Sequence, residues 1–257
     1  YTKKDSYDYG LMISASHNPY YDNGIKIFKK NGEKLNDKEE LEIESILEKI
    51  QDDVPLLKNL KKKIKKNLSH YDKFLKQKFS KLKNIKLKVL IDCANGSLSD
   101  FGPKFFRDIG AELITYGCNP NGKNINKLCG ATFPERLSKL TQKNKVDIGI
   151  SFDGDADRVI ICDENGKILD GDLMLAVISK FQDQLFKNNY RSIVSTKMCS
   201  LSFRDFINIS GLKLHVADVG DKNVIEKMKK TKSPLGGEPS GHIVFSENGF
   251  CGDGLLT

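Results

Sequence analysis

Three aspartates at alternate positions are the residues of this sequence best placed to do chemistry. Asp153, Asp155 and Asp157 lie in the run D-G-D-A-D-R, directly after the apolar segment 148–152. Three carboxylates this close together would repel one another without a cation between them. Ligand sets made only of oxygen favour Mg²⁺ or Ca²⁺. We therefore expect a divalent cation here. The adjacent Arg158 can serve as a charge partner or bind a phosphate with two hydrogen bonds.

The same segment has part of the pattern of a calcium-binding EF-hand loop. Counted from Asp153, positions 1, 3 and 5 are Asp and position 12 is Glu164. Position 6, however, is Arg158, where the sharp turn of that loop requires glycine. The flanking segments also have strand patterns, whereas an EF-hand needs helices. These departures argue against an EF-hand.

A serine lies where a predicted strand meets a loop. Ser16 stands in S-A-S-H-N-P, and the polar stretch continues to Gly24 and Lys26. The hydroxyl of a serine at such a junction can project from the sheet, although Ser, Asn, Pro and Gly are also the usual residues of turns. A serine hydrolase is disfavoured, because Ser16 and His17 are adjacent and no G-x-S-x-G turn is present. The spacing alone is more typical of a structural loop.

Two further loops combine glycine with polar side chains. In G-E-P-S-G-H, the residues Glu238, Ser240 and His242 offer donors and acceptors suited to sugar hydroxyls, although a plain hairpin loop has the same composition. The stretch N-P-N-G-K-N-I-N at 119–126, followed by C-G-A-T at 129–132, is by itself a polar loop with turn residues. Neither loop indicates a function when taken alone.

The elements that must position these loops alternate between strand and helix patterns, which is typical of an α/β fold. The pattern restarts near Asn84 and again after the predicted hairpin at Asn165-Gly166. Loops that follow strand ends are where α/β sheets place ligands. We expect strands at 10–14, 25–29, 87–92, 112–116, 147–152, 192–196 and 213–216, and helices from 36, around 101–109, from 132, and at 172–186, 201–209 and 221–230.

Composition narrows the class of protein. Hydrophobic residues make up 39% and charged residues 30% of the 257 residues, and no apolar run approaches the ~20 residues of a membrane-spanning helix. The net charge of +8 comes mostly from Lys, whereas a nucleic-acid reader typically uses Arg with aromatic stacking partners. We expect neither a membrane nor a nucleic-acid partner. The six cysteines form no C-x-x-C pair and fit a reducing cytoplasm.

Taken together, the loops resemble the α-D-phosphohexomutase family. Its signatures are a serine loop of the form (T/S)-A-S-H-N-P, a metal loop D-G-D-(G/A)-D-R and a sugar loop G-E-x-S-G-H, and all three occur here in that order. The resemblance implies consecutive three-layer α/β/α domains with mixed sheets. Domain I would cover 1–83, domain II 84–168 and domain III 169–257, the first and last incomplete. A fourth domain with an R-x-S-G-T-E-P-type loop has no counterpart in the sequence, so we expect a partial chain.

The resemblance also implies a mechanism. Phosphorylated Ser16 donates its phosphoryl group to a sugar monophosphate, and the bisphosphorylated sugar then returns the other one. Mg²⁺ would be held by Asp153, Asp155, Asp157 and a phosphoserine oxygen. Lys26 and Arg158 would stabilise the moving phosphate, and His17 would contact phosphate or transfer a proton. The predicted substrate-binding residues are Glu238, Ser240, His242 and Lys197, although Lys197 fits a solvated loop lysine equally well.

Several segments are similar to the branch of the family that interconverts glucosamine-6-phosphate and glucosamine-1-phosphate through glucosamine-1,6-bisphosphate. They are Y-D-N-G-I-K at 21–26, D-C-A-N-G at 92–96, the loop at 120–132 and V-G-D-K at 219–222. Two residues depart from that branch, since Lys222 replaces a usual Arg and Pro239 a usual Gln or Asn. The alternatives are a mutase for mannose or glucose phosphates, and a metal- and phosphate-binding module without turnover.

Overall fold

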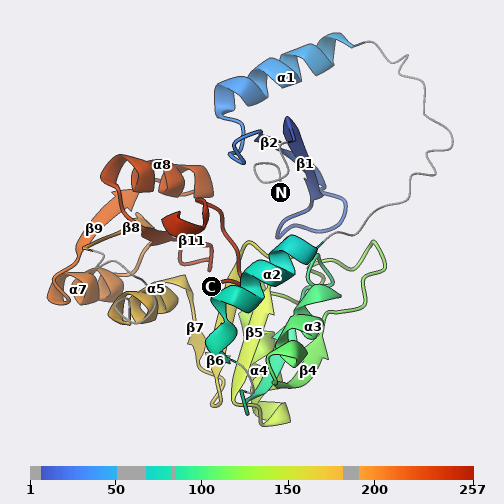
Figure 1. The fold of residues 1–257 in the computed structure, drawn as a ribbon, viewed down its shortest axis with the longest axis vertical. Helices are drawn as coiled ribbons and strands as arrows, with labels where there is room; N and C mark the ends of the chain where they lie inside the picture. Colours follow the sequence, from blue (N-terminus) through green and yellow to red (C-terminus); the bar gives the residue numbers. More distant parts are fainter. Residues whose placement is uncertain (1–6, 51–67, 83–84, 182–190) are drawn as a thin grey trace. The chain divides into compact units, whose positions relative to one another are not determined.

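The computed structural model describes residues 7–50, 68–82, 85–181 and 191–257 (Figure 1). They belong to two compact units. The first comprises Tyr1–Ser14 with Gly24–Lys78, and the second comprises Ala15–Asn23 with Phe79–Thr257. All of the predicted site residues except Lys26 therefore lie in the second unit. Across the described ranges, no helix combines the length and the apolar character needed to cross a bilayer.

The first unit contains a hairpin and two helices. Strand β1 (Tyr9–Ser14) pairs antiparallel with β2 (Gly24–Lys29), and helices α1 (Asp37–Lys49) and α2 (Ser69–Lys78) follow. Helix α1 begins where the sequence predicts, because Asn36 and Glu39 form a reciprocal capping box with N···O distances of 3.0 and 2.8 Å. The apolar side of α1 is not buried by the described residues: Leu41 is 63% and Leu47 60% exposed.

The second unit contains two sheets, of which the first is mixed, as predicted. Its strands are β3 (Lys88–Asp92), β4 (Glu112–Tyr116), β5 (Ile148–Phe152), β6 (Val159–Asp163) and β7 (Ile168–Leu169). Their order is β4-β3-β5-β6-β7, in which β4, β3 and β5 run parallel and β6 and β7 are antiparallel to their neighbours.

Helices cover both faces of this sheet. Gly102 of α3 (Phe101–Asp108) lies beside Ile91, whereas Leu137 of α4 (Pro134–Asn144) shares a buried cluster with Leu90. Successive residues of a strand point to opposite faces, so α3 and α4 lie on opposite sides and the module has three layers. Helix α4 begins at Pro134 rather than at the predicted Thr132, because the fixed φ of proline suits the first turn of a helix.

The second sheet repeats this architecture. Its strands are β8 (Ser192–Thr196), β9 (Lys213–Ala217), β10 (Leu235–Gly237) and β11 (Ile243–Phe245), in the order β11-β10-β8-β9. Only β11 is antiparallel to its neighbour. Helix α8 (Asp221–Thr231) lies on one side, and α5 (Gly171–Lys180) with α7 (Leu201–Ile209) on the other (Figure 1). The predicted helix 172–186 is thus observed as α5, and its residues 182–186 lie outside the described ranges.

Candidate functional site

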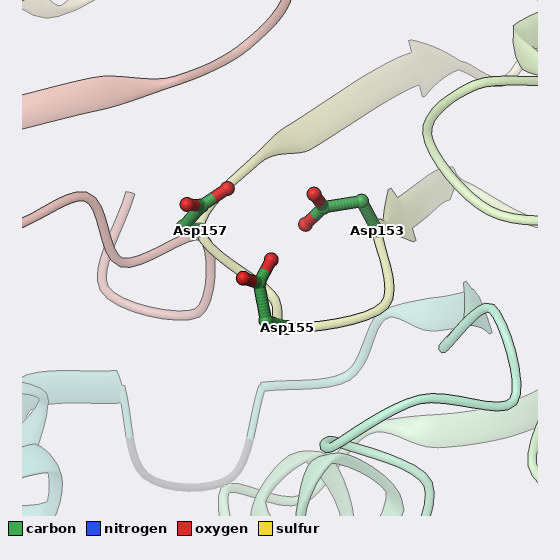
Figure 2. A group of neighbouring side chains, drawn as sticks. All are labelled: Asp153, Asp155 and Asp157. Carbon is green, nitrogen blue, oxygen red and sulfur yellow. The ribbon is translucent and has the colours of Figure 1, made fainter. Parts of the chain in front are cut away.

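The loop after β5 brings the three aspartates together. One carboxylate oxygen from each of Asp153, Asp155 and Asp157 lies within 4.8 Å of the others, and Figure 2 shows the three carboxylates turned toward a common space. The loop is tight, because the N–H of Ala156 donates to the carbonyl of Asp153 (3.1 Å) and the N–H of Arg158 donates to Asp153 Oδ1 (3.1 Å). Ala156 adopts a left-handed conformation, with φ 63°.

The electrostatics of this loop suit a cation. Asp153 is 1% exposed, and its pKa is raised to about 8, first by burial and then by the charges of Asp157 and Asp155. Its Oδ2 is buried and has no hydrogen-bond partner among the described residues. A divalent cation would coordinate that oxygen and favour the ionised carboxylates, and oxygen ligands of this kind suit Mg²⁺. The residues present therefore fit a metal ion.

The backbone around Ser16 lies directly on the metal loop. An added Cβ on Gly154 would lie 2.5 Å from the carbonyl oxygen of Ser16, so only glycine permits this approach. Asn126 Nδ2 donates to the carbonyl oxygens of Ser16 (2.7 Å) and Asn18 (2.8 Å). Ser16 itself has φ 49°, a left-handed conformation that costs a non-glycine residue about 1–2 kcal/mol. The surrounding contacts stabilise this conformation of the serine.

A second layer of contacts supports both loops. Asp92, at the end of β3, is buried and accepts hydrogen bonds from the N–H groups of Ala94 (3.0 Å) and Gly130 (3.1 Å). The N–H of Ser97 donates to the carbonyl of Gly154 (2.8 Å). The end of β3 thus supports the metal loop, and an added Cβ on Gly96 would lie 2.2 Å from the carbonyl oxygen of Gly154.

The loop between β10 and β11 is joined through the backbone to the first residues of β6 and α5. The N–H of Val159 donates to the carbonyl of Gly241 (3.1 Å), and the N–H of Gly171 donates to the carbonyl of Pro239 (3.0 Å). One carboxylate oxygen of Glu238 accepts a hydrogen bond from the N–H of Gly220 at the start of α8 (2.9 Å). Ser240, which lies between Pro239 and Gly241, is exposed.

The imidazole of His242 is buried beside a predicted metal ligand. His242 is only 4% exposed, and its Nδ1 lies 3.6 Å from Oδ1 of Asp157. An added Cβ on Gly252 would lie 2.2 Å from Cε1 of His242, so Gly252 leaves the space that the ring occupies. His242 therefore faces an aspartate, which suits a role in holding Asp157.

The remaining predicted site residues are His17, Arg158, Lys197 and Lys26. His17 is exposed on the Ser16 loop, and Arg158 is half-buried after the metal loop. Lys197 follows β8 and forms an exposed ion pair with Asp218 (2.9 Å). This pair holds the pKa of Asp218 below its ordinary value through a hydrogen bond and charge attraction. Lys26 lies on β2 of the first unit, opposite Met12.

Sequence patterns alone did not single out three supporting residues: Asn126, Gly154 and Asp92. Asn126 belongs to a loop with ordinary turn composition, and its bonds reach Ser16, 110 positions away. Nothing in the local spacing indicates this contact. The second unit thus combines a serine, three carboxylates that fit a cation, and a polar hairpin loop.

Models of three domains of one family match the chain in sequence. Phosphoglucomutase/phosphomannomutase α/β/α domain I matches residues 1–54, domain II matches 69–166 and domain III matches 170–257. The order agrees with the order predicted from the motifs. The boundaries that we predict at 83/84 and 168/169 remain a prediction.

Curated relatives match along nearly the whole chain. A phosphoglucosamine mutase from Brevibacillus brevis is 44% identical over 259 residues, covering 97% of this chain and 56% of its own length. One from Staphylococcus epidermidis is 41% identical over 268 residues, covering 100% of this chain and 57% of its own length. The chain therefore spans a little over half the length of these relatives.

Solved structures have the same fold at lower sequence identity. A putative phosphomannomutase from Thermus thermophilus superposes with a TM-score of 0.78 at 20% identity, covering 99% of this chain and 59% of its own. N-acetylphosphoglucosamine mutase from Aspergillus fumigatus, solved with GlcNAc-6P and magnesium, gives a TM-score of 0.72 at 20% identity, covering 99% and 70%. The family models, the relatives and the fold agree: the chain belongs to the phosphoglucomutase/phosphomannomutase family.

Proposed function

We propose that this protein interconverts glucosamine-6-phosphate and glucosamine-1-phosphate, with Ser16 as the phosphoryl carrier. The observation that carries the proposal is the contact between two loops: the Ser16 backbone lies against Gly154, within the loop of three aspartates. The 41–44% identity to phosphoglucosamine mutases favours a glucosamine phosphate as the substrate. The product would feed the synthesis of UDP-N-acetylglucosamine.

The reaction consists of two transfers. In the first, the bond between phosphorus and Ser16 Oγ breaks as the free hydroxyl of the sugar monophosphate bonds to phosphorus, and that hydroxyl loses its proton. The resulting glucosamine-1,6-bisphosphate reorients, and its other phosphoryl group returns to Ser16 by the reverse step. His17, exposed on the same loop, is our candidate to accept and return the proton.

Mg²⁺ bound by Asp153, Asp155, Asp157 and a phosphoserine oxygen would neutralise charge on the phosphoryl group. The chain's own residues then perform the positioning. Arg158, directly after the third aspartate, would bind the phosphoryl oxygens.

Lys26 of the first unit is a candidate phosphate ligand by its motif alone, as a point charge. Glu238, Ser240 and Lys197 would hold sugar hydroxyls or phosphate in both orientations of the intermediate. His242 is a candidate substrate ligand by its motif, whereas its buried position beside Asp157 favours a role in holding that aspartate. The six free cysteines support a reducing, cytoplasmic setting for this chemistry.

A mutase for mannose or glucose phosphates is the second candidate, because the matching family models are named for phosphoglucomutases and phosphomannomutases. The identity to phosphoglucosamine mutases favours the first candidate over it. Pro239, however, supplies neither a backbone donor nor a polar side chain where the sugar loop could recognise an amino group. The 257 residues taken alone could instead bind metal and phosphate without turnover, since they cover only 56–57% of the relatives' length.

The test is a substrate comparison on the full-length protein with Mg²⁺. We expect kcat/KM to be highest for glucosamine phosphates, and Ser16→Ala to abolish both turnover and phosphoserine. A higher kcat/KM for mannose or glucose phosphates would select the second candidate. Unchanged turnover in Ser16→Ala would refute the phosphoserine mechanism for either sugar. Turnover by the 257-residue chain alone would refute the binding-module alternative.

A further inference from the structure

Asn126 links the phosphate-carrying loop to the sheet of the metal loop. It lies in the G-K-N-I-N segment, 110 positions after Ser16, and is 6% exposed. Its Nδ2 donates one hydrogen bond to the carbonyl of Ser16 (2.7 Å) and a second to the carbonyl of Asn18 (2.8 Å). Both N–H groups of the amide are therefore used on either side of His17. Because carbonyl oxygens only accept, the nitrogen of the amide must face this loop.

The position of Asn126 is itself fixed. Its backbone N–H donates to the carbonyl of Ala94 (2.9 Å), and the N–H of Ala94 donates to the buried carboxylate of Asp92 at the end of β3 (3.0 Å). A continuous series of hydrogen bonds therefore runs from β3 to Ser16. The other side of the Ser16 carbonyl is bounded by Gly154.

The conformation of Ser16 makes this restraint important. A φ of 49° is sparsely populated for serine, so an unrestrained loop would move to other conformations. Any such movement would shift Oγ relative to the aspartates. A displacement of about 1 Å in a reacting group costs roughly 100-fold in rate. The two hydrogen bonds from Asn126 restrain the Ser16 loop against such a displacement.

We propose that Asn126 is a positioning residue that sets the place of Ser16 Oγ relative to the three aspartates. This inference rests on the proposed function, because it assigns Asn126 to the transfer step at Ser16. Asn126 makes none of the described hydrogen bonds to the G-E-P-S-G-H loop, so it should influence the transfer rate and leave sugar binding nearly unchanged.

The test uses Asn126→Asp in the full-length protein. This change keeps the size of the side chain but replaces the donor with a carboxylate oxygen that repels both carbonyls. We expect kcat to fall about 100-fold while KM changes less than about threefold. A second readout does not need turnover: amide hydrogen exchange in residues 15–23 should rise about tenfold or more.

Asn124→Asp is the matched control. The amide of Asn124 donates to the carbonyl of Asn119 (2.9 Å) within the same loop and has no described bond to the Ser16 segment. This variant should loosen its own loop, yet leave kcat within about threefold of the unsubstituted protein and exchange in 15–23 unchanged. An equal loss of kcat in both variants would overturn the proposal, as would a rise in KM at constant kcat in Asn126→Asp.

The exchange measurement separates the two hypotheses. If the protein turns over no hexose phosphate but Asn126→Asp still frees residues 15–23, the proposed function fails while the restraint stands. If turnover is normal and exchange is unaffected, the positioning role fails alone. Should Asn126→Asp not fold, Asn126→Ala, which removes the donor without adding a charge, is judged by the same criteria. Failure of both to fold would make Asn126 a stability residue and overturn the proposal.

Discussion

The buried carboxyl of Asp153 should make the cation-free protein less stable as the pH rises. Its pKa in the folded state is about 8, against an ordinary value of 3.8, and the causes are burial and the neighbouring aspartates. Between these two values the folded protein retains a proton that the unfolded chain releases. The stabilisation is therefore fully present below about pH 4 and is lost as the pH rises through about 8.

The size of the effect follows from one proton. Stability changes by about 1.4 kcal/mol per pH unit when the two states differ by one bound proton. From about pH 5 to about pH 7.5 the loss is about 3 kcal/mol. For a domain of this size, the melting temperature should fall by about 6–12 °C. Saturating Mg²⁺ should replace the proton, so its stabilising effect should be larger at the higher pH.

Thermal melts of the 257-residue chain in EDTA and in Mg²⁺, across this pH range, measure both effects. Asp153→Asn mimics the protonated carboxyl and should remove most of the pH slope and most of the response to Mg²⁺. Asp205→Asn, which alters an exposed carboxylate on α7, is the matched control and should behave like the unsubstituted chain. The reasoning fails if Asp153→Asn retains the full pH slope, or if the melting temperature in EDTA rises over this range.

Three further substitutions test the supporting contacts. Gly154→Ala places a methyl group 2.5 Å from the carbonyl oxygen of Ser16. We expect the free energy of unfolding in urea to fall by about 1–3 kcal/mol and kcat to fall roughly 100-fold. Values like those of the unsubstituted protein would contradict the contact. Asp92→Asn removes an acceptor from one of two buried N–H groups and should lower the free energy of unfolding by about 1–3 kcal/mol; an unchanged urea midpoint would speak against it. Gly252→Ala pushes on His242 and should weaken Mg²⁺ binding about tenfold by calorimetry, a prediction that an unaltered affinity would exclude.

The sequence predicted the elements well wherever local patterns decide structure. The continuous apolar runs at 87–92 and 147–152 are observed as β3 and β5, because strands buried on both faces need no polar alternation. The capping box of α1 is present because its two bonds involve only Asn36 and Glu39. The cluster of three aspartates could likewise be predicted, because its members are two residues apart in the sequence.

Contacts that join distant segments were beyond the reach of these patterns. The bonds from Asn126 to the Ser16 loop join segments that are 110 and 108 positions apart, which no local spacing reveals. Likewise, the motif predicts Glu238 as a substrate ligand, yet one of its carboxylate oxygens accepts a hydrogen bond from the N–H of Gly220 at the start of α8. The helix predicted from 36 is present as α1, yet local patterns do not reveal what covers it, and the described residues leave Leu41 and Leu47 exposed.

The way in which the β10–β11 loop is attached bears on how such enzymes can diversify. At positions 239 and 241 its links to the rest of the unit run through main-chain atoms: the N–H of Val159 donates to the carbonyl of Gly241, and the N–H of Gly171 donates to the carbonyl of Pro239. The bonded atoms are the same whichever side chain stands at 239 or 240, provided that glycine is kept at 241, where an added Cβ would lie 2.1 Å from the carbonyl oxygen of Val159. Under the proposed function, substitutions at 239 and 240 would change the contacts to the sugar while these two main-chain bonds stay in place. Substrate preference could then change in evolution without disturbing the path of the loop.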